Sequence, residues 1–92
     1  MKHAGAKTLD RLEPLLRELR AFEGLKEKSR GCFYIGGKGF LHFHEHRGDE
    51  IYADIGLGQD FDRLRAETDA QHRKILARAA RALRDGKPAR AR

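Results

Sequence analysis

The stretch FLHFHEHRGDEIYADIGL, residues 40–57, decides the fold, because two strand-like runs flank one short polar connection. Successive side chains of a strand point to opposite faces, so the alternate apolar residues of the second run share one face. They are Ile51, Ala53, Ile55 and Leu57. In the first run we assign Leu41 and Phe43 to the same buried face, because burying three histidines without partners would be costly. The outer face then carries the other side chains of both runs: Phe40, His42, His44, His46, Tyr52 and Asp54.

These faces constrain the turn between the two runs. A two-residue loop would bring the histidines onto the isoleucine face. A three-residue loop over residues 47–49, with its glycine left-handed, pairs His42 with Asp54 and keeps the apolar residues of both runs together. We therefore expect the three-residue loop.

A third strand-like run, CFYI over residues 32–35, precedes this hairpin and is joined to it by GGKG. A three-residue loop there would pair Phe33 with Phe43, and the alternative is a two-residue loop at Gly37 and Lys38. With the three-residue loop, the outer face carries two rows across the strands: Tyr34–His42–Asp54 and Cys32–His44–Tyr52.

Helical periodicity lies on both sides of the three strands. Over residues 8–24, apolar side chains recur at steps of three and four: Leu9, Leu12, Leu15, Leu16, Leu19 and Phe22. Asp10 and Glu13 have the spacing of a capping box, Gly24 is a natural stop, and Pro14 would kink or delay the helix. Residues 25–31 read as polar and irregular.

A second helix opens with a capping box at Thr68 and Gln71 and ends at Gly86 and Pro88. Its apolar stripe is formed by His72, Ile75, Leu76, Ala79, Ala80 and Leu83. The order α-β-β-β-α predicts one α+β domain over residues 1–92, a three-stranded antiparallel meander with two helices packed on one face. We expect residues 87–92 to form a disordered basic tail.

The histidines suggest a metal site on the outer face. Alternate residues of a strand have Cα atoms about 6.5–7 Å apart, which lets two imidazoles reach one ion. His42, His44 and Asp54 are the expected ligands of zinc or another divalent metal, with Cys32 or His46 in reserve. Two alternatives stay open: a solvated polar face partnered by Asp54 and tyrosine, and a proton-transfer or pH-switch role.

The positive charge suggests a different partner. The net charge is +6, and residues 73–92 hold eight of the twenty lysines and arginines but one of the fourteen acids, so the excess lies in the last helix and tail. Five cations fall opposite its apolar stripe: Arg73, Lys74, Arg78, Arg81 and Arg84. They predict binding of an anionic partner such as nucleic acid through phosphate contacts. A solvated arginine face, balanced in part by acids of the first helix, and an anionic membrane surface are the alternatives.

The aromatic side chains of the outer face offer contacts of their own: Tyr34, Phe40 and Tyr52. They would stack unpaired bases of a nucleic acid or bury one another in a homodimer across the open sheet face. Because such a dimer would bring histidines together, it should dissociate as the pH falls through about 6.

Other classes of protein are disfavoured. The single Cys32 excludes an intramolecular disulfide framework. The chain opens with no charged-then-apolar leader and has no long apolar run, so we expect a soluble cytoplasmic protein. The sequence shows no nucleophile elbow, no glycine-rich phosphate loop leading into a helix and no paired carboxylates in an evident cleft. We therefore expect a non-enzymatic binding or interaction module that requires no cofactor beyond a divalent metal.

Residues 31–57 resemble a group of short, uncharacterised bacterial proteins that share a domain of unknown function. The shared features are the hairpin residues Phe33-Tyr34, the run Phe40 to His44, and the strand Tyr52-Ala53-Asp54. The resemblance implies the hairpin fold and implies no activity.

Overall fold

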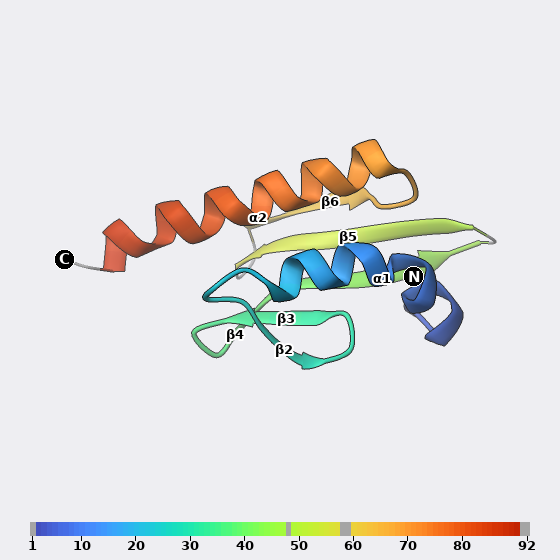
Figure 1. The fold of residues 1–92 in the computed structure, drawn as a ribbon, viewed down its shortest axis with the longest axis horizontal. Helices are drawn as coiled ribbons and strands as arrows, with labels where there is room; N and C mark the ends of the chain where they lie inside the picture. The colour runs from blue at the N-terminus through green and yellow to red at the C-terminus, as the bar shows by residue number, and fades with distance from the viewer. Residues whose placement is uncertain (1, 48, 58–59, 91–92) are drawn as a thin grey trace.

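Six strands and two helices make up the computed structural model, which describes residues 2–47, 49–57 and 60–90 (Figure 1). The elements are β1 (Lys2–His3), α1 (Ala6–Arg20), β2 (Lys26–Ser29), β3 (Cys32–Ile35), β4 (Lys38–His46), β5 (Glu50–Leu57), β6 (Asp60–Arg65) and α2 (Asp69–Arg90). The α+β class and the order of the five predicted elements are confirmed. The sheet is larger than predicted, because three strands were missed.

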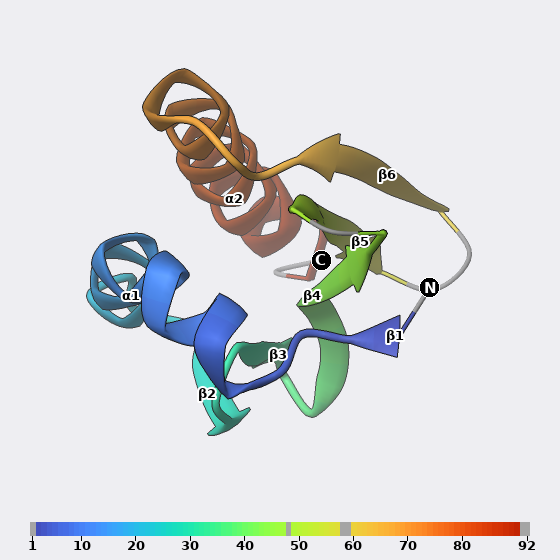
Figure 2. The same cartoon turned by 90° about the vertical axis from the view of Figure 1, so that its right-hand side faces the viewer.

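All strand pairs in the sheet are antiparallel, in the order β2-β3-β4-β5-β6, and β1 also pairs with β4. Because β5 occupies the other edge of β4, β1 and β3 share one edge, each along a different part of the strand. Both helices lie on the same side of the sheet (Figure 2). The face that carries the histidines is therefore the uncovered one, as the alternation predicted.

The three missed strands lack the alternation that marks a half-buried strand. Strand β1 has two residues, β2 is KEKS, and β6 is DFDRLR. Strands β2 and β6 are the edge strands, where charged side chains discourage pairing with other molecules. The turn from β2 to β3 also depends on Gly31, which has a φ of 82°. A Cβ atom on this glycine would lie 2.7 Å from Leu9 Cδ2.

The register of the central hairpin is confirmed. Strands β4 and β5 pair His42 with Asp54, with residues 47–49 as the loop between them. The predicted left-handed glycine, Gly48, lies outside the described residues. Within the loop, Arg47 has a positive φ of 29°.

The predicted register between β3 and β4 is wrong, and so is the alternative loop. The strands turn at Gly36 and Gly37, whose φ angles of 56° and 84° suit the primed turn that a two-residue hairpin favours. Phe33 pairs with Leu41 and keeps its buried face. The register then shifts, which leaves Phe40 as the extra residue of a bulge.

Helix α1 begins and is capped differently from the prediction. It starts at Ala6, so Asp10 and Glu13 lie inside the helix and form no capping box. The carboxylate of Glu45, from β4, instead accepts hydrogen bonds from the Gly5 N–H and the Thr8 side chain at the helix N-terminus. The bond from Gly5, followed by that from Thr8, lowers the pKa of Glu45. A strand residue distant in sequence thus replaces the local cap.

Helix α2 carries the predicted capping box. The Gln71 side chain accepts from the Thr68 N–H at 3.0 Å, and the Thr68 hydroxyl accepts from the Gln71 N–H at 3.2 Å. The helix continues to Arg90, so the predicted end at Gly86 and Pro88 is wrong. Whether residues 87–92 are ordered in solution stays a prediction, and residues 91 and 92 lie outside the described part.

The core fills the space between the helices and the sheet. The apolar stripes of both helices face it, with Leu12, Leu15, Leu16, Leu19, Ile75 and Ala79 buried. The sheet contributes Phe33, Leu41, Phe43, Ile51, Ala53 and Ile55. Neither helix, over the residues described, combines the length and the apolar run that crossing a lipid bilayer would require.

Candidate metal centre on the open sheet face

Strand pairing places seven polar side chains and one cysteine in two rows across the uncovered face. The rows are His3–His44–Tyr52–Arg65 and Cys32–His42–Asp54–Arg63. The pairs of histidines with β5 are those predicted. Because the β3 register differs from the prediction, Cys32 lies beside His42 instead of His44, and Tyr34 leaves the row.

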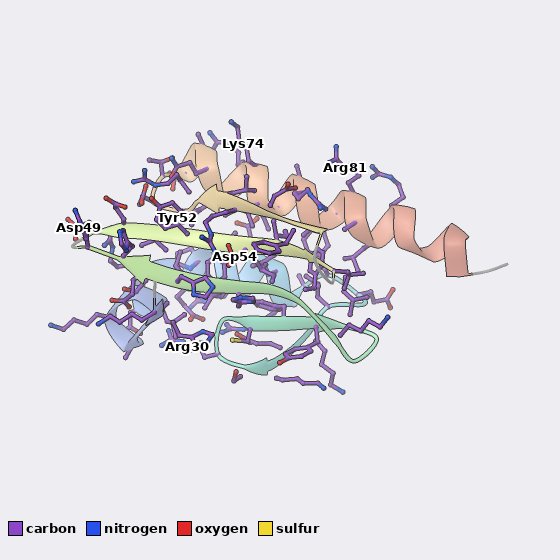
Figure 3. All side chains as sticks on the ribbon, turned by 180° about the vertical axis from the view of Figure 1, so that it is seen from behind. Arg30, Asp49, Tyr52, Asp54, Lys74 and Arg81 are labelled. Atoms are coloured by element: carbon purple, nitrogen blue, oxygen red, sulfur yellow. The ribbon has the colours of Figure 1, made fainter. Side chains whose placement is uncertain are left out.

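Asp54 lies at the centre of this arrangement and is 6% exposed (Figure 3). The Arg63 guanidinium donates to both of its oxygens, from Nε to Oδ1 at 2.7 Å and from Nη2 to Oδ2 at 2.9 Å. This paired, charge-assisted contact holds the pKa of Asp54 below its usual value. The carboxylate is therefore ionised at neutral pH.

Both predicted histidines approach the same carboxylate oxygen. Asp54 Oδ2 lies 3.0 Å from His44 Nε2 and 3.8 Å from His42 Nε2. One ligand atom from each of the three side chains lies within 4.8 Å of the other two. Donors around a tetrahedral zinc ion lie about 3.4 Å apart, given bonds of about 2.1 Å. Small side-chain rotations would therefore bring the three donors onto one ion.

The imidazoles also have spare capacity to bind. His44 Nδ1 is buried and, within the described part of the chain, has no hydrogen-bond partner. Burial, followed by the charge of His44, lowers the pKa of His42. His42 is consequently neutral at pH 7, which is the form that coordinates metals.

His3 is a third imidazole at this centre, and the sequence interpretation missed it. Its ring centroid lies 5.3 Å from that of His44 and 5.9 Å from that of His42, while His42 and His44 are 4.7 Å apart. The side chain arrives on the two-residue strand β1. Such a short strand leaves no periodic signal, so nothing local in the sequence points to His3.

Cys32 and His46, the two further ligands that the sequence suggested, lie at different distances from the cluster of three donors. Cys32 is half-buried beside His42, and with His3 it lines a hollow of about 280 Å³. His46 is exposed at the end of β4, where it pairs with Glu50, outside the cluster of three donors. Cys32 thus borders the centre, whereas His46 does not belong to it.

The predicted aromatic surface is smaller than expected. Phe40 is 2% exposed, so its assignment as an exposed contact residue is wrong. Lys28 Nζ lies 4.6 Å from the centroid of the Tyr34 ring, and Arg65 stacks 5.1 Å above Tyr52. Base stacking and dimerisation through this face stay predictions, with two partly covered tyrosines to support them.

Three of the basic side chains of α2 line a second hollow, on the β6 side. Arg73, Lys74, Arg81 and Arg84 are exposed, and Lys74 and Arg81 project from α2 away from β4 and β5 (Figure 3). Arg78 is half-buried and binds Asp62 of β6 at 3.0 Å. A hollow of about 290 Å³ between β6 and α2 is lined by Asp62, Leu64, Lys74, Ala77, Arg78 and Arg81.

No family model, curated protein or solved structure that was compared with the chain matches it. The resemblance of residues 31–57 to short bacterial proteins therefore stays a prediction.

Proposed function

We propose that this protein binds one divalent transition-metal ion through His42, His44 and Asp54. The observation that carries the proposal is the convergence of their three donor atoms to within 4.8 Å on adjacent strands. Strands hold side chains more rigidly than loops do, so little ordering is needed on binding. His3 lies beside this centre, and the three ligands leave one position of a tetrahedral ion open.

The donor set indicates which metals to expect. Two imidazoles and one carboxylate bind zinc in tetrahedral sites and iron(II) in sites with open positions. Asp54 also keeps a second partner, because Arg63 Nε bonds to Oδ1 while Oδ2 faces the histidines. Zinc, which has no redox chemistry, is the suitable probe.

Calorimetric titration of the metal-free protein with zinc tests the proposal. We expect one equivalent to bind with micromolar or tighter affinity. His42→Ala and His44→Ala should each weaken binding by more than about 100-fold, since loss of an outer partner alone costs about 10–100-fold. His46→Ala is the matched control, because it removes a histidine from the same strand outside the cluster.

Equal losses in all three variants would mean that zinc binds histidines without regard to the cluster. Binding of several weak equivalents would have the same meaning. Either result contradicts the proposed centre.

A second candidate function is binding of an anionic partner such as nucleic acid through α2. It is favoured by the hollow that three cations line beside β6: Lys74, Arg78 and Arg81. Asp62 neutralises one of them, which leaves a positive surplus for phosphates. This function uses a different part of the molecule, so the two candidates can be tested separately.

Fluorescence anisotropy with a labelled single-stranded oligonucleotide tests the second candidate. The double variant Lys74→Ala/Arg81→Ala should weaken binding and reduce the salt dependence of log K by about 1.4, if each cation meets one phosphate. Lys7→Ala/Lys38→Ala removes two exposed lysines from other elements and is the matched control. Equal effects of the two double variants would indicate attraction by net charge alone and contradict a site on α2.

A further inference from the structure

The proposed metal centre opens onto a hollow of about 200 Å³ on the same face. Its lining is Gly39, Phe40, His42, Asp54, Gly56 and Phe61. The hollow thus combines two proposed ligands with the exposed ring of Phe61, and two glycines leave space where side chains would stand. Pockets for drug-sized ligands measure about 300–1,000 Å³. This one suits a smaller molecule that has both a metal-binding group and an apolar body.

A bound metal would leave the centre with surplus positive charge. Asp54 is the one acid among the three ligands, and Arg63 already matches its charge. Imidazoles coordinate metals in their neutral form, so the two histidines add no charge to the bound centre. A divalent ion would therefore bring about two uncompensated positive charges into a partly desolvated site, and an anionic ligand would balance them.

The Arg63 guanidinium is placed to help hold such an anion. Its Nη2 lies 2.9 Å from Asp54 Oδ2, the oxygen that both histidines approach. With a metal–oxygen bond of about 2.1 Å, Nη2 lies no more than about 5 Å from the ion. When Oδ2 turns to the metal, Nε keeps its bond to Oδ1 and Nη2 becomes available. A carboxylate can then place one oxygen on the ion and the other on Nη2.

We propose that the metal-loaded centre binds a small aromatic carboxylate, with its ring in the hollow against Phe61. The inference rests on the proposed metal binding and names the ligand class of the same site. Phe61 is 48% exposed, and its ring lies 5.9 Å from the Arg63 guanidinium. An exposed aromatic ring therefore lies next to the expected position of the anion. Aromatic rings favour contact with other rings over contact with short alkyl chains.

Benzoate and acetate, titrated into the zinc-loaded protein and followed by NMR, test this inference. Both carry the carboxylate, and benzoate alone carries the ring. We expect benzoate to bind at least about 10-fold more tightly than acetate, and Phe61→Ala to remove about 10-fold of benzoate affinity. Leu57→Ala is the matched control, because Leu57 is 41% exposed at the end of β5 and does not line the hollow. Metal-free protein should bind neither anion measurably.

The zinc titration, run first, decides the metal proposal by itself, and its failure would overturn both. If zinc binds but benzoate binds no more tightly than acetate, the ligand class is wrong and the metal centre stands. Unchanged benzoate affinity in Phe61→Ala would likewise overturn the placement of the ring.

Discussion

Asp54 is the buried carboxylate around which the charged side chains of the uncovered sheet face are arranged. A carboxylate that is 6% exposed needs strong partners, and it has Arg63 on one side and two imidazoles on the other. The guanidinium and a metal ion compete for the same oxygen, Oδ2. The metal-free protein therefore has its own stable arrangement, in which Arg63 supplies the positive charge.

Arg63→Ala should have opposite effects on the metal-free protein and on zinc binding. Without metal, the variant should unfold at a lower urea concentration than the native protein, because a buried carboxylate loses its main partner. Its zinc affinity should rise by about 10-fold, because a competing cation has gone from within about 5 Å of the ion. Urea titrations with and without zinc measure both effects.

Arg65→Ala is the control for that variant, since Arg65 is on the same strand and binds Glu67 instead of Asp54. The interpretation of Asp54 is wrong if both variants unfold at the same urea concentration. Reduced zinc affinity in Arg63→Ala would show that Arg63 supports the metal site instead of competing with it.

Alternation along two strands was sufficient to predict His42, His44 and Asp54 as one cluster. The argument worked because the hydrophobic residues of β4 and β5 leave one consistent register. His3 and Arg63 could not be predicted in the same way. They arrive on β1 and β6, whose pairing depends on the edges of strands already formed.

At the scale of elements, an ion-pair network fixes α1 to the turn between β2 and β3. Glu13 accepts from Arg20 at 2.7 Å and from Arg30 at 2.8 Å. Arg20 also binds Glu27 of β2, and Glu27 accepts from the Gly31 N–H at 2.9 Å. Asp10 and Glu13 of α1 thus pair with Arg30, near β2, and with arginines of α1 itself.

This network predicts a specific dependence of stability on pH. Hydrogen bonds from Arg20 and then Arg30 lower the pKa of Glu13 from 4.5 to about 2. Because the folded pKa is below the unfolded one, the stabilisation is complete above about pH 4.5 and is lost as the pH falls through about 2. Glu13→Gln should therefore lower the urea midpoint at pH 7 and reduce its fall between pH 5 and pH 2.

Glu18→Gln, at an exposed position of the same helix, is the control and should leave the pH profile unchanged. An unaltered profile in Glu13→Gln would show that other carboxylates carry the acid sensitivity.

Some helices and strands could be predicted from the sequence, and others could not. Both helices and the central hairpin have strong periodicity, and the capping box at Thr68 and Gln71 is local, so all were predicted, although the start of α1 and the end of α2 were not. The charged strands β2 and β6 have no such pattern. The cap of α1 could not be predicted because Glu45 lies forty residues away from Gly5. The β3–β4 register was missed because the bulge at Phe40 has no sequence signature of its own.

In the part of the chain that the structure describes, both helices cover one face of the sheet and leave the other face uncovered (Figures 1 and 2). The proposed ligands come from β4 and β5, so a single ion would join two adjacent strands of the sheet. Binding of a ligand to the folded state alone adds to the free energy of unfolding. Metal binding should therefore stabilise the entire fold.

Thermal unfolding measures this stabilisation. At a free zinc concentration of 100 times the Kd, the free energy of unfolding should rise by about 2.7 kcal/mol. For a chain of this size, the Tm should then rise by roughly 10–20 °C. His44→Ala should show no such rise, whereas His46→Ala should behave like the native protein. A Tm that zinc leaves unchanged or lowers would mean that the ion does not prefer the folded state.

The most direct test of the metal centre is a zinc titration of the metal-free protein followed through the histidine imidazole NMR signals. We predict that the signals of His42 and His44 shift together and saturate at one equivalent, with the signal of His3 changing in parallel. The signal of His46 should stay constant. Independent shifts of all the histidines, without saturation at one equivalent, would contradict the centre and reduce the open face to a solvated polar surface.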